Sequence, residues 1–117
     1  MSVFLVVLMM LSLSVVAFAA GKAVAYGGEY TELLGSGNCA NKTISVYCIN
    51  TSTLHHNDVR MLDSSGNIVW EEYGAIDYSG SRSFWCGSNV YSIQIRVGAK
   101  NILGDLIPKF ATCDVIF

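Results

Sequence analysis

Period-two alternation of apolar and polar residues recurs along this chain and constrains its fold more than any other feature. In Val90–Val97, every second residue from Tyr91 onward is apolar and the residues between them are polar. Thr43–Ile49 alternates in the same way, with Cys48 on the apolar face. Such alternation is typical of half-buried antiparallel strands. Helical turns are expected only at Thr31–Leu34 and Asn101–Leu106, and both segments are too short for a stable helix.

Turn residues separate these segments about every ten positions, as in small all-β domains. The clearest turn is Ser64–Asn67, which joins Val59–Asp63 to Ile68–Glu72 and contains a glycine suited to a tight reversal. Further strands are expected at Lys22–Tyr26, Arg82–Cys86 and 112–117. We therefore predict an all-β fold, a small antiparallel β-sandwich of about six to seven short strands that is stabilised by disulfides.

The first residues of the chain have the pattern of a secretory signal peptide. An apolar run ends in small residues, with Ala17 and Ala19 spaced as a signal peptidase requires. We predict a signal peptide at 1–19, cleavage near Ala19 or Ala20, and one secreted, extracellular domain at 20–117. The alternative is an uncleaved anchor, because the run from Val3 to Ala20 is just long enough to reach the threshold for a membrane span.

Export makes the four cysteines candidates for disulfides. Cys39, Cys48, Cys86 and Cys113 allow three pairings, among which sequence does not choose. Face parity favours a core bridge from Cys48 to Cys86, which leaves Cys39 to meet Cys113. No Cys-x2-Cys unit is present, so we expect no metal site.

Two triplets, beginning at Asn41 and Asn50, match the N-glycosylation motif and lie at either end of one expected strand. Asn41 has the parity of the outward face, where a glycan does not disturb packing. We predict that both asparagines carry glycans; the alternative is that they are unmodified loop residues.

Charge and motifs exclude several classes of function. Seven basic and nine acidic residues give a net charge of −2, with no basic stripe for nucleic acid and no polybasic cluster for a membrane. We expect no cofactor and no catalytic residue. His55 and His56 with Asp58 are interpreted as a polar turn, and the side chains of Glu71 and Glu72 diverge on a strand.

A binding role has more support. Residues 72–85 combine aromatic, charged and small side chains, a composition found in recognition surfaces. The candidate binding residues are Tyr73, Asp77, Tyr78, Arg82 and Trp85, whereas Trp70 and Phe84 are expected in the core. We predict a non-enzymatic module that binds an extracellular protein or glycan, of unspecified oligomeric state. The alternatives are a carrier of a small apolar ligand and an enzyme centred on Asp58, His55 and Glu71.

Overall fold

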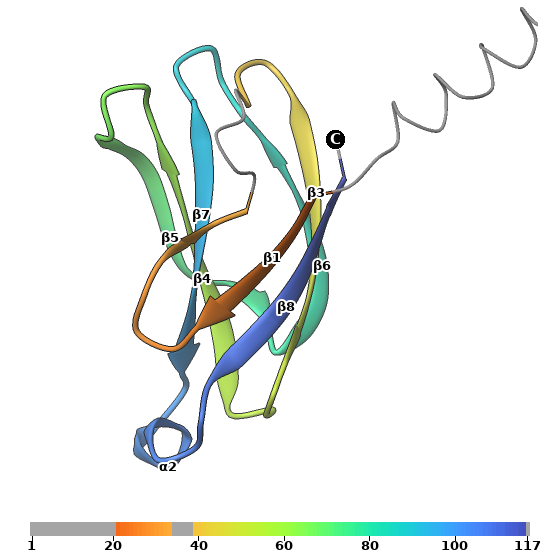
Figure 1. The fold of residues 1–117 in the computed structure, drawn as a ribbon, viewed down its shortest axis with the longest axis vertical. Helices are drawn as coiled ribbons and strands as arrows, with labels where there is room; N and C mark the ends of the chain where they lie inside the picture. Colours follow the sequence, from red (N-terminus) through yellow and green to blue (C-terminus); the bar gives the residue numbers. More distant parts are fainter. Residues whose placement is uncertain (1–20, 34–38, 117) are drawn as a thin grey trace, which may run out of the picture.

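A computed structural model describes residues 21–33 and 39–116, which form two facing antiparallel sheets (Figure 1). In order across the first sheet the strands are β1 (Gly21–Tyr26), β8 (Phe110–Ile116), β3 (Thr43–Asn50) and β6 (Ser79–Trp85). In order across the second they are β2 (Thr31–Glu32), β7 (Ser92–Ala99), β4 (His55–Leu62) and β5 (Ile68–Asp77). The short helix α2 (Ile102–Asp105) lies at one pole.

The all-β, disulfide-stabilised sandwich predicted from the alternation is confirmed. The described residues form eight strands, because the two-residue β2 replaces the helical turn expected at Thr31–Leu34. The other expected turn, at Asn101–Leu106, is present as α2, which Asn101 caps by accepting a hydrogen bond from the Gly104 N–H at 2.9 Å. The predicted signal peptide at 1–19 and its cleavage site lie outside the described residues.

The apolar faces predicted from the sequence form the core between the sheets. In β3, Ile44, Val46 and Cys48 are fully buried. In β7, Ile93, Ile95 and Val97 are buried opposite them. The alternation therefore predicted correctly which side of β3 and of β7 faces inward, except at Tyr91, which precedes β7 and is 38 % exposed.

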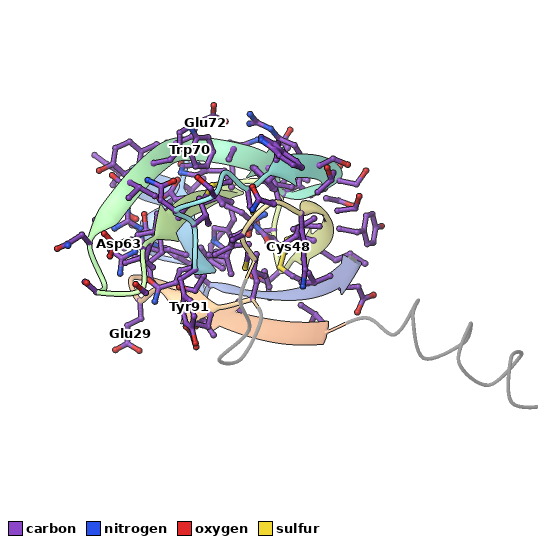
Figure 2. The ribbon with its side chains drawn as sticks, turned by 90° about the horizontal axis from the view of Figure 1, so that it is seen from above. Glu29, Cys48, Asp63, Trp70, Glu72 and Tyr91 are labelled. Atoms are coloured by element: carbon purple, nitrogen blue, oxygen red, sulfur yellow. A yellow bond between two sulfur atoms is a disulfide. The ribbon has the colours of Figure 1, made fainter. Side chains whose placement is uncertain are left out.

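The disulfide joins Cys48 to Cys113, so the pairing of Cys48 with Cys86 expected from face parity is wrong. The reason lies in the strand order. Since β8 pairs with β3, Cys48 and Cys113 are direct cross-strand partners with Cα atoms 4.2 Å apart. On the other side of β3, Cys48 lies opposite Gly80, and Cys86 is six residues farther along the chain, just past the end of β6. Figure 2 shows Cys48 in the molecule's interior.

The polar turn expected at His55–Asp58 is also wrong, because these residues begin β4. The strand is paired on one side with β7 and on the other with β5, so its backbone belongs to the middle of a sheet. Its polar side chains are accommodated by partners of their own.

The predicted hairpin between β4 and β5 is confirmed. Gly66 adopts a positive φ of 86°, and the Asp63 carboxylate accepts the N–H groups of Asn67 and Ser65, both at 2.9 Å. These bonds, that from Asn67 above all, hold the pKa of Asp63 below its usual value. Asp63 therefore closes the turn in its ionised form.

Asp63→Ala is expected to destabilise the domain at neutral pH and to have a smaller effect in acid. Because the pKa is depressed in the folded state, the stabilisation is present above the unfolded-state pKa of about 3.9 and is lost as pH falls through the folded pKa. Urea unfolding at pH 7 and pH 3 measures both effects. Ser64→Ala, in the same exposed turn, is the control. An equal effect of Asp63→Ala at both pH values would contradict this role.

Candidate functional site

The structure divides the five predicted binding residues among three places. Arg82 and Trp85 line one groove between the edges of the two sheets. Tyr73 lines a separate shallow pocket beside Asp58 and Arg96. Asp77 and Tyr78 lie where β5 passes into β6, and there Asp77 pairs with Lys100, whose ammonium group also lies 5.8 Å from the centre of the Tyr78 ring. The predicted segment therefore does not form one surface.

The groove, which we call the tryptophan groove, is an open pocket of about 350 Å³. It is lined by Met61, Val69, Trp70, Arg82, Ser83, Phe84, Trp85, Gly87, Asn89 and Val90. Trp85 stands at its rim with 63 % of its surface exposed, whereas Phe84 is buried beneath. Trp70 meets Phe84 edge to face, with ring centroids 5.8 Å apart. Two indoles therefore line a partly apolar opening, the usual composition of a binding pocket.

The groove lies along an edge of the sandwich where neither sheet continues. Among residues 21–33 and 39–116, β5 ends the second sheet and β6 ends the first, so each is paired with another described strand on one side only. Seen from above, the two strands follow one side of the molecule, with Trp70 and Glu72 labelled there, and β1 lies on the opposite side (Figure 2). Edge strands carry backbone groups that another strand can pair with. The tryptophan groove is thus bordered by two potential pairing edges.

Arg82 lines the groove and is held in place by contacts to both strands. Its guanidinium forms an ion pair with Glu72 of β5 and donates to the Ala75 carbonyl at 3.2 Å. The same group lies 5.1 Å from the centre of the Phe84 ring. Arg82 thus links the two edge strands, β5 and β6, beside the groove.

Part of the groove is formed by residues that the sequence does not indicate as binding residues. Trp70, expected in the core, does pack against the core but also lines the groove. Gly87, Asn89 and Val90 were not proposed, although the run of small and polar residues after Cys86 is a signal for a loop. What could not be read from sequence is that this loop meets β5.

Apart from the tryptophan groove, a cluster of polar side chains surrounds Asp58 on the outer face of the second sheet. Arg96 donates to one carboxylate oxygen from two nitrogens, at 3.0 and 2.9 Å. The other oxygen accepts the Gly74 N–H at 2.8 Å and lies 3.1 Å from His56 Nε2. Burial is the largest single influence and opposes the charge of Arg96, but the hydrogen bonds and charge of Asp58, together with Tyr30 and Tyr73, outweigh it and raise the pKa of Arg96. Asp58 is itself buried and has a partner for each oxygen.

Tyr30 covers this cluster. Its ring lies 3.8 Å from the Arg60 guanidinium carbon and 4.7 Å from that of Arg96, so both arginines contact its π face. Burial raises the pKa of the Tyr30 phenol, so the ring is uncharged at neutral pH. These contacts stabilise the outer face of the sheet and account for its polar composition.

The residues named for an enzyme alternative do not converge. His55 is fully buried and contacts the Thr51 hydroxyl at 3.2 Å and the Gly104 carbonyl at 3.3 Å, away from the cluster. Glu71 is hydrogen-bonded to Tyr73, and this bond raises the pKa of the tyrosine. Asp58 therefore contacts His56 but not His55, and each of its carboxylate oxygens already has hydrogen-bonding or ionic partners. This arrangement has the character of a structural ion pair.

Gly98→Ala is expected to destabilise the domain by about 1–2 kcal/mol through overpacking. A Cβ at this position would lie 2.6 Å from His56 Nε2 and 3.2 Å from Asp58 Oδ2, so the cluster would have to shift. Gly80→Ala is the matched control, since its Cβ would meet Ile76 at an ordinary 3.8 Å. Thermal unfolding of both variants measures the difference. Equal losses in the two would contradict close packing around His56.

The two candidate glycosylation sites differ in exposure. Asn41 is exposed, in a turn with a φ of 59°. Asn50 is only 9 % exposed, and both polar atoms of its side-chain amide are buried. A glycan on Asn50 would require this side chain to leave the core, so the fold disfavours that site. Glycosylation of Asn41 stays a prediction.

One more surface is apolar. Ile102, Leu103 and Leu106 on and beside α2 are 82, 60 and 78 % exposed at the pole of the molecule. We call them the apolar tip. Within residues 21–33 and 39–116, no helix is long and apolar enough to cross a membrane. In the same residues no group of three or more His, Cys, Asp or Glu side chains is arranged to hold a metal ion.

Comparison with known proteins adds little to this picture. No protein-family model and no curated protein matches the chain. A similar solved structure comes from a study entitled "Bacillus endospore appendages form a novel family of disulfide-linked pili". It is 12 % identical, with a TM-score of 0.43 over 85 % of each chain. A similarity this weak shows neither a family nor a function for this chain.

Proposed function

We propose that this protein is a secreted, disulfide-stabilised, non-enzymatic module that binds an extended segment of another extracellular protein in the tryptophan groove. The observation that carries the proposal is that one groove is lined by Trp70 from the edge strand β5 and by Trp85 from the edge strand β6. A segment that pairs with one edge can place an apolar side chain against the indoles. Backbone pairing then supplies affinity and the groove supplies specificity.

Two features support this choice over a glycan. Both borders of the groove are strands whose outer edges offer backbone N–H and C=O groups in a row, as polypeptide requires. The exposed face of Trp85 lies at the rim, where aromatic side chains commonly dominate binding energy. Secretion is supported by the buried disulfide, since such bonds persist in oxidising compartments.

Selection from a displayed library of random linear peptides tests this function. Peptides that share an apolar or aromatic position are expected to be recovered, and Trp85→Ala is expected to weaken their binding by about tenfold or more. Tyr47→Ala is the matched control, because Tyr47 is an exposed aromatic residue on the outer face of the same sheet. Affinities are measured by titration with synthetic peptides.

Two results would count against the proposal. Recovered peptides that bind Trp85→Ala as tightly as wild type would place the site elsewhere. Binding of immobilised glycans, lost in Trp85→Ala and without any peptide binding, would retain the groove but contradict a polypeptide ligand.

A further inference from the structure

We infer that Cys39 and Cys86 form a second disulfide, which fastens the loop before β3 to the end of β6. Both side chains are fully buried in the same core cluster. The structure contains them as two thiols joined by a side-chain hydrogen bond. The bond between Cys48 and Cys113 leaves these two cysteines as each other's neighbours.

The backbone holds the two residues together independently of their side chains. The ladder between β3 and β6 pairs Thr43 with Trp85, and beyond it Cys86 donates its N–H to the Lys42 carbonyl at 2.9 Å. Lys42 in turn donates to the Cys39 carbonyl at 3.2 Å, which folds Cys39 back over this pair. Both cysteines are therefore positioned around Lys42 by ordered hydrogen bonds. A disulfide requires this proximity of the two Cα atoms.

The chemistry calls for an external oxidant of the disulfide class, such as glutathione disulfide. One cysteine thiolate attacks the oxidant's sulfur, forming a mixed disulfide and releasing one thiolate. The other cysteine then attacks the protein sulfur of that mixed disulfide and releases the second thiolate. The protein loses two protons and two electrons, and the oxidant is reduced to two thiols.

Burial sets the time at which this reaction occurs. Burial first, and then the neighbouring Cys39, raises the pKa of the Cys86 thiol to about 11. The attacking species is the thiolate, which is scarce at neutral pH in the folded domain. The bond therefore forms during folding, before the core closes, and folded reduced protein resists later oxidation.

The bond has a consequence for the tryptophan groove, and this part rests on the proposed function. Cys86 lies between Trp85 and Gly87, both of which line the groove. Fixing Cys86 limits the movement of the rim and reduces the conformational entropy lost on binding. We expect a Cys39→Ala/Cys86→Ala variant to bind the selected peptides several-fold more weakly than wild type.

Tryptic mapping of the secreted, unreduced protein tests the bond directly. Cleavage after lysine and arginine places the four cysteines in separate peptides, 23–42, 43–60, 83–96 and 110–117. After remaining thiols are blocked with iodoacetamide, we expect 23–42 linked to 83–96 and 43–60 linked to 110–117. Alkylated Cys39 and Cys86, a link from 43–60 to 83–96, or a dimer held by either cysteine would each contradict the inference.

The tryptic map tests the disulfide and the peptide-affinity measurement tests its effect on the groove, so either can give a negative result without the other. A mapped bond with unchanged peptide affinity in Cys39→Ala/Cys86→Ala refutes the effect on the rim and leaves the bond standing. A failed peptide selection refutes the proposed function without touching the map. Refolding of reduced protein adds a check on timing. Glutathione disulfide present during refolding is expected to form the bond, whereas the same oxidant added after refolding is expected to leave Cys86 reduced.

Discussion

Replacing Cys48 and Cys113 together with alanine is expected to lower the free energy of unfolding by about 4 kcal/mol. The bond closes a loop between residues 65 positions apart, and in the chain-entropy model such a restraint removes much of the freedom of the unfolded chain. A small domain has only about 5–15 kcal/mol of stability, so the variant is expected to be close to unfolding at physiological temperature.

Urea unfolding measures this loss. Thr112→Ala is the control, because Thr112 precedes Cys113 on the same strand and is not buried; its effect is expected to stay within about 0.5 kcal/mol. A loss below about 1 kcal/mol in the double variant would show that the restraint predicted from loop length does not operate.

Asp58→Asn is expected to destabilise the domain by about 2–4 kcal/mol, the second large effect. The substitution keeps the size of the side chain but removes the charge that Arg96 contacts with two nitrogens. It leaves a guanidinium, only 30 % exposed, without its counter-charge. The result is an uncompensated charge next to the sheet, which costs more than the lost hydrogen bonds alone.

A double-mutant cycle distinguishes this from a general loss of packing. Arg96→Met in the Asp58→Asn background removes both partners, so its total cost is expected to be smaller than the sum of the two single effects. Glu32→Gln is the control, since Glu32 is an exposed carboxylate in the same sheet. Additive single effects would mean that Asp58 and Arg96 do not act as a pair.

Local pattern predicted the strands and their inward faces because alternation reports directly on which side of a strand is buried. It predicted the turn at Gly66 for the same local reason. It could not predict the pairing of Cys48 with Cys113, which depends on β8 lying beside β3. Nor could it predict that β4 begins at His55, because the partners of Asp58 come from β5 and β7.

In the candidate site, too, some residues could be predicted from local sequence and others depend on how the sheets are arranged. Arg82 and Trp85 were named from composition, and both line the tryptophan groove. The same composition also indicates Tyr73 and Asp77, yet Tyr73 lies beside Asp58 and Arg96 and Asp77 pairs with Lys100. Residues 72–85 are therefore neighbours in sequence, but their candidate binding residues do not form one continuous binding surface. The groove itself arises from two sheet edges that meet only in the folded structure.

Backbone and indole chemical shifts, measured by NMR while a selected peptide is titrated, test the central claim most directly. We expect the largest changes at the indole N–H groups of Trp70 and Trp85 and at the backbone amides of β5 and β6. We also expect new cross-strand contacts between the peptide and one of these edges. Changes centred on the apolar tip, with both indoles unmoved, would contradict the assignment of the tryptophan groove as the binding site.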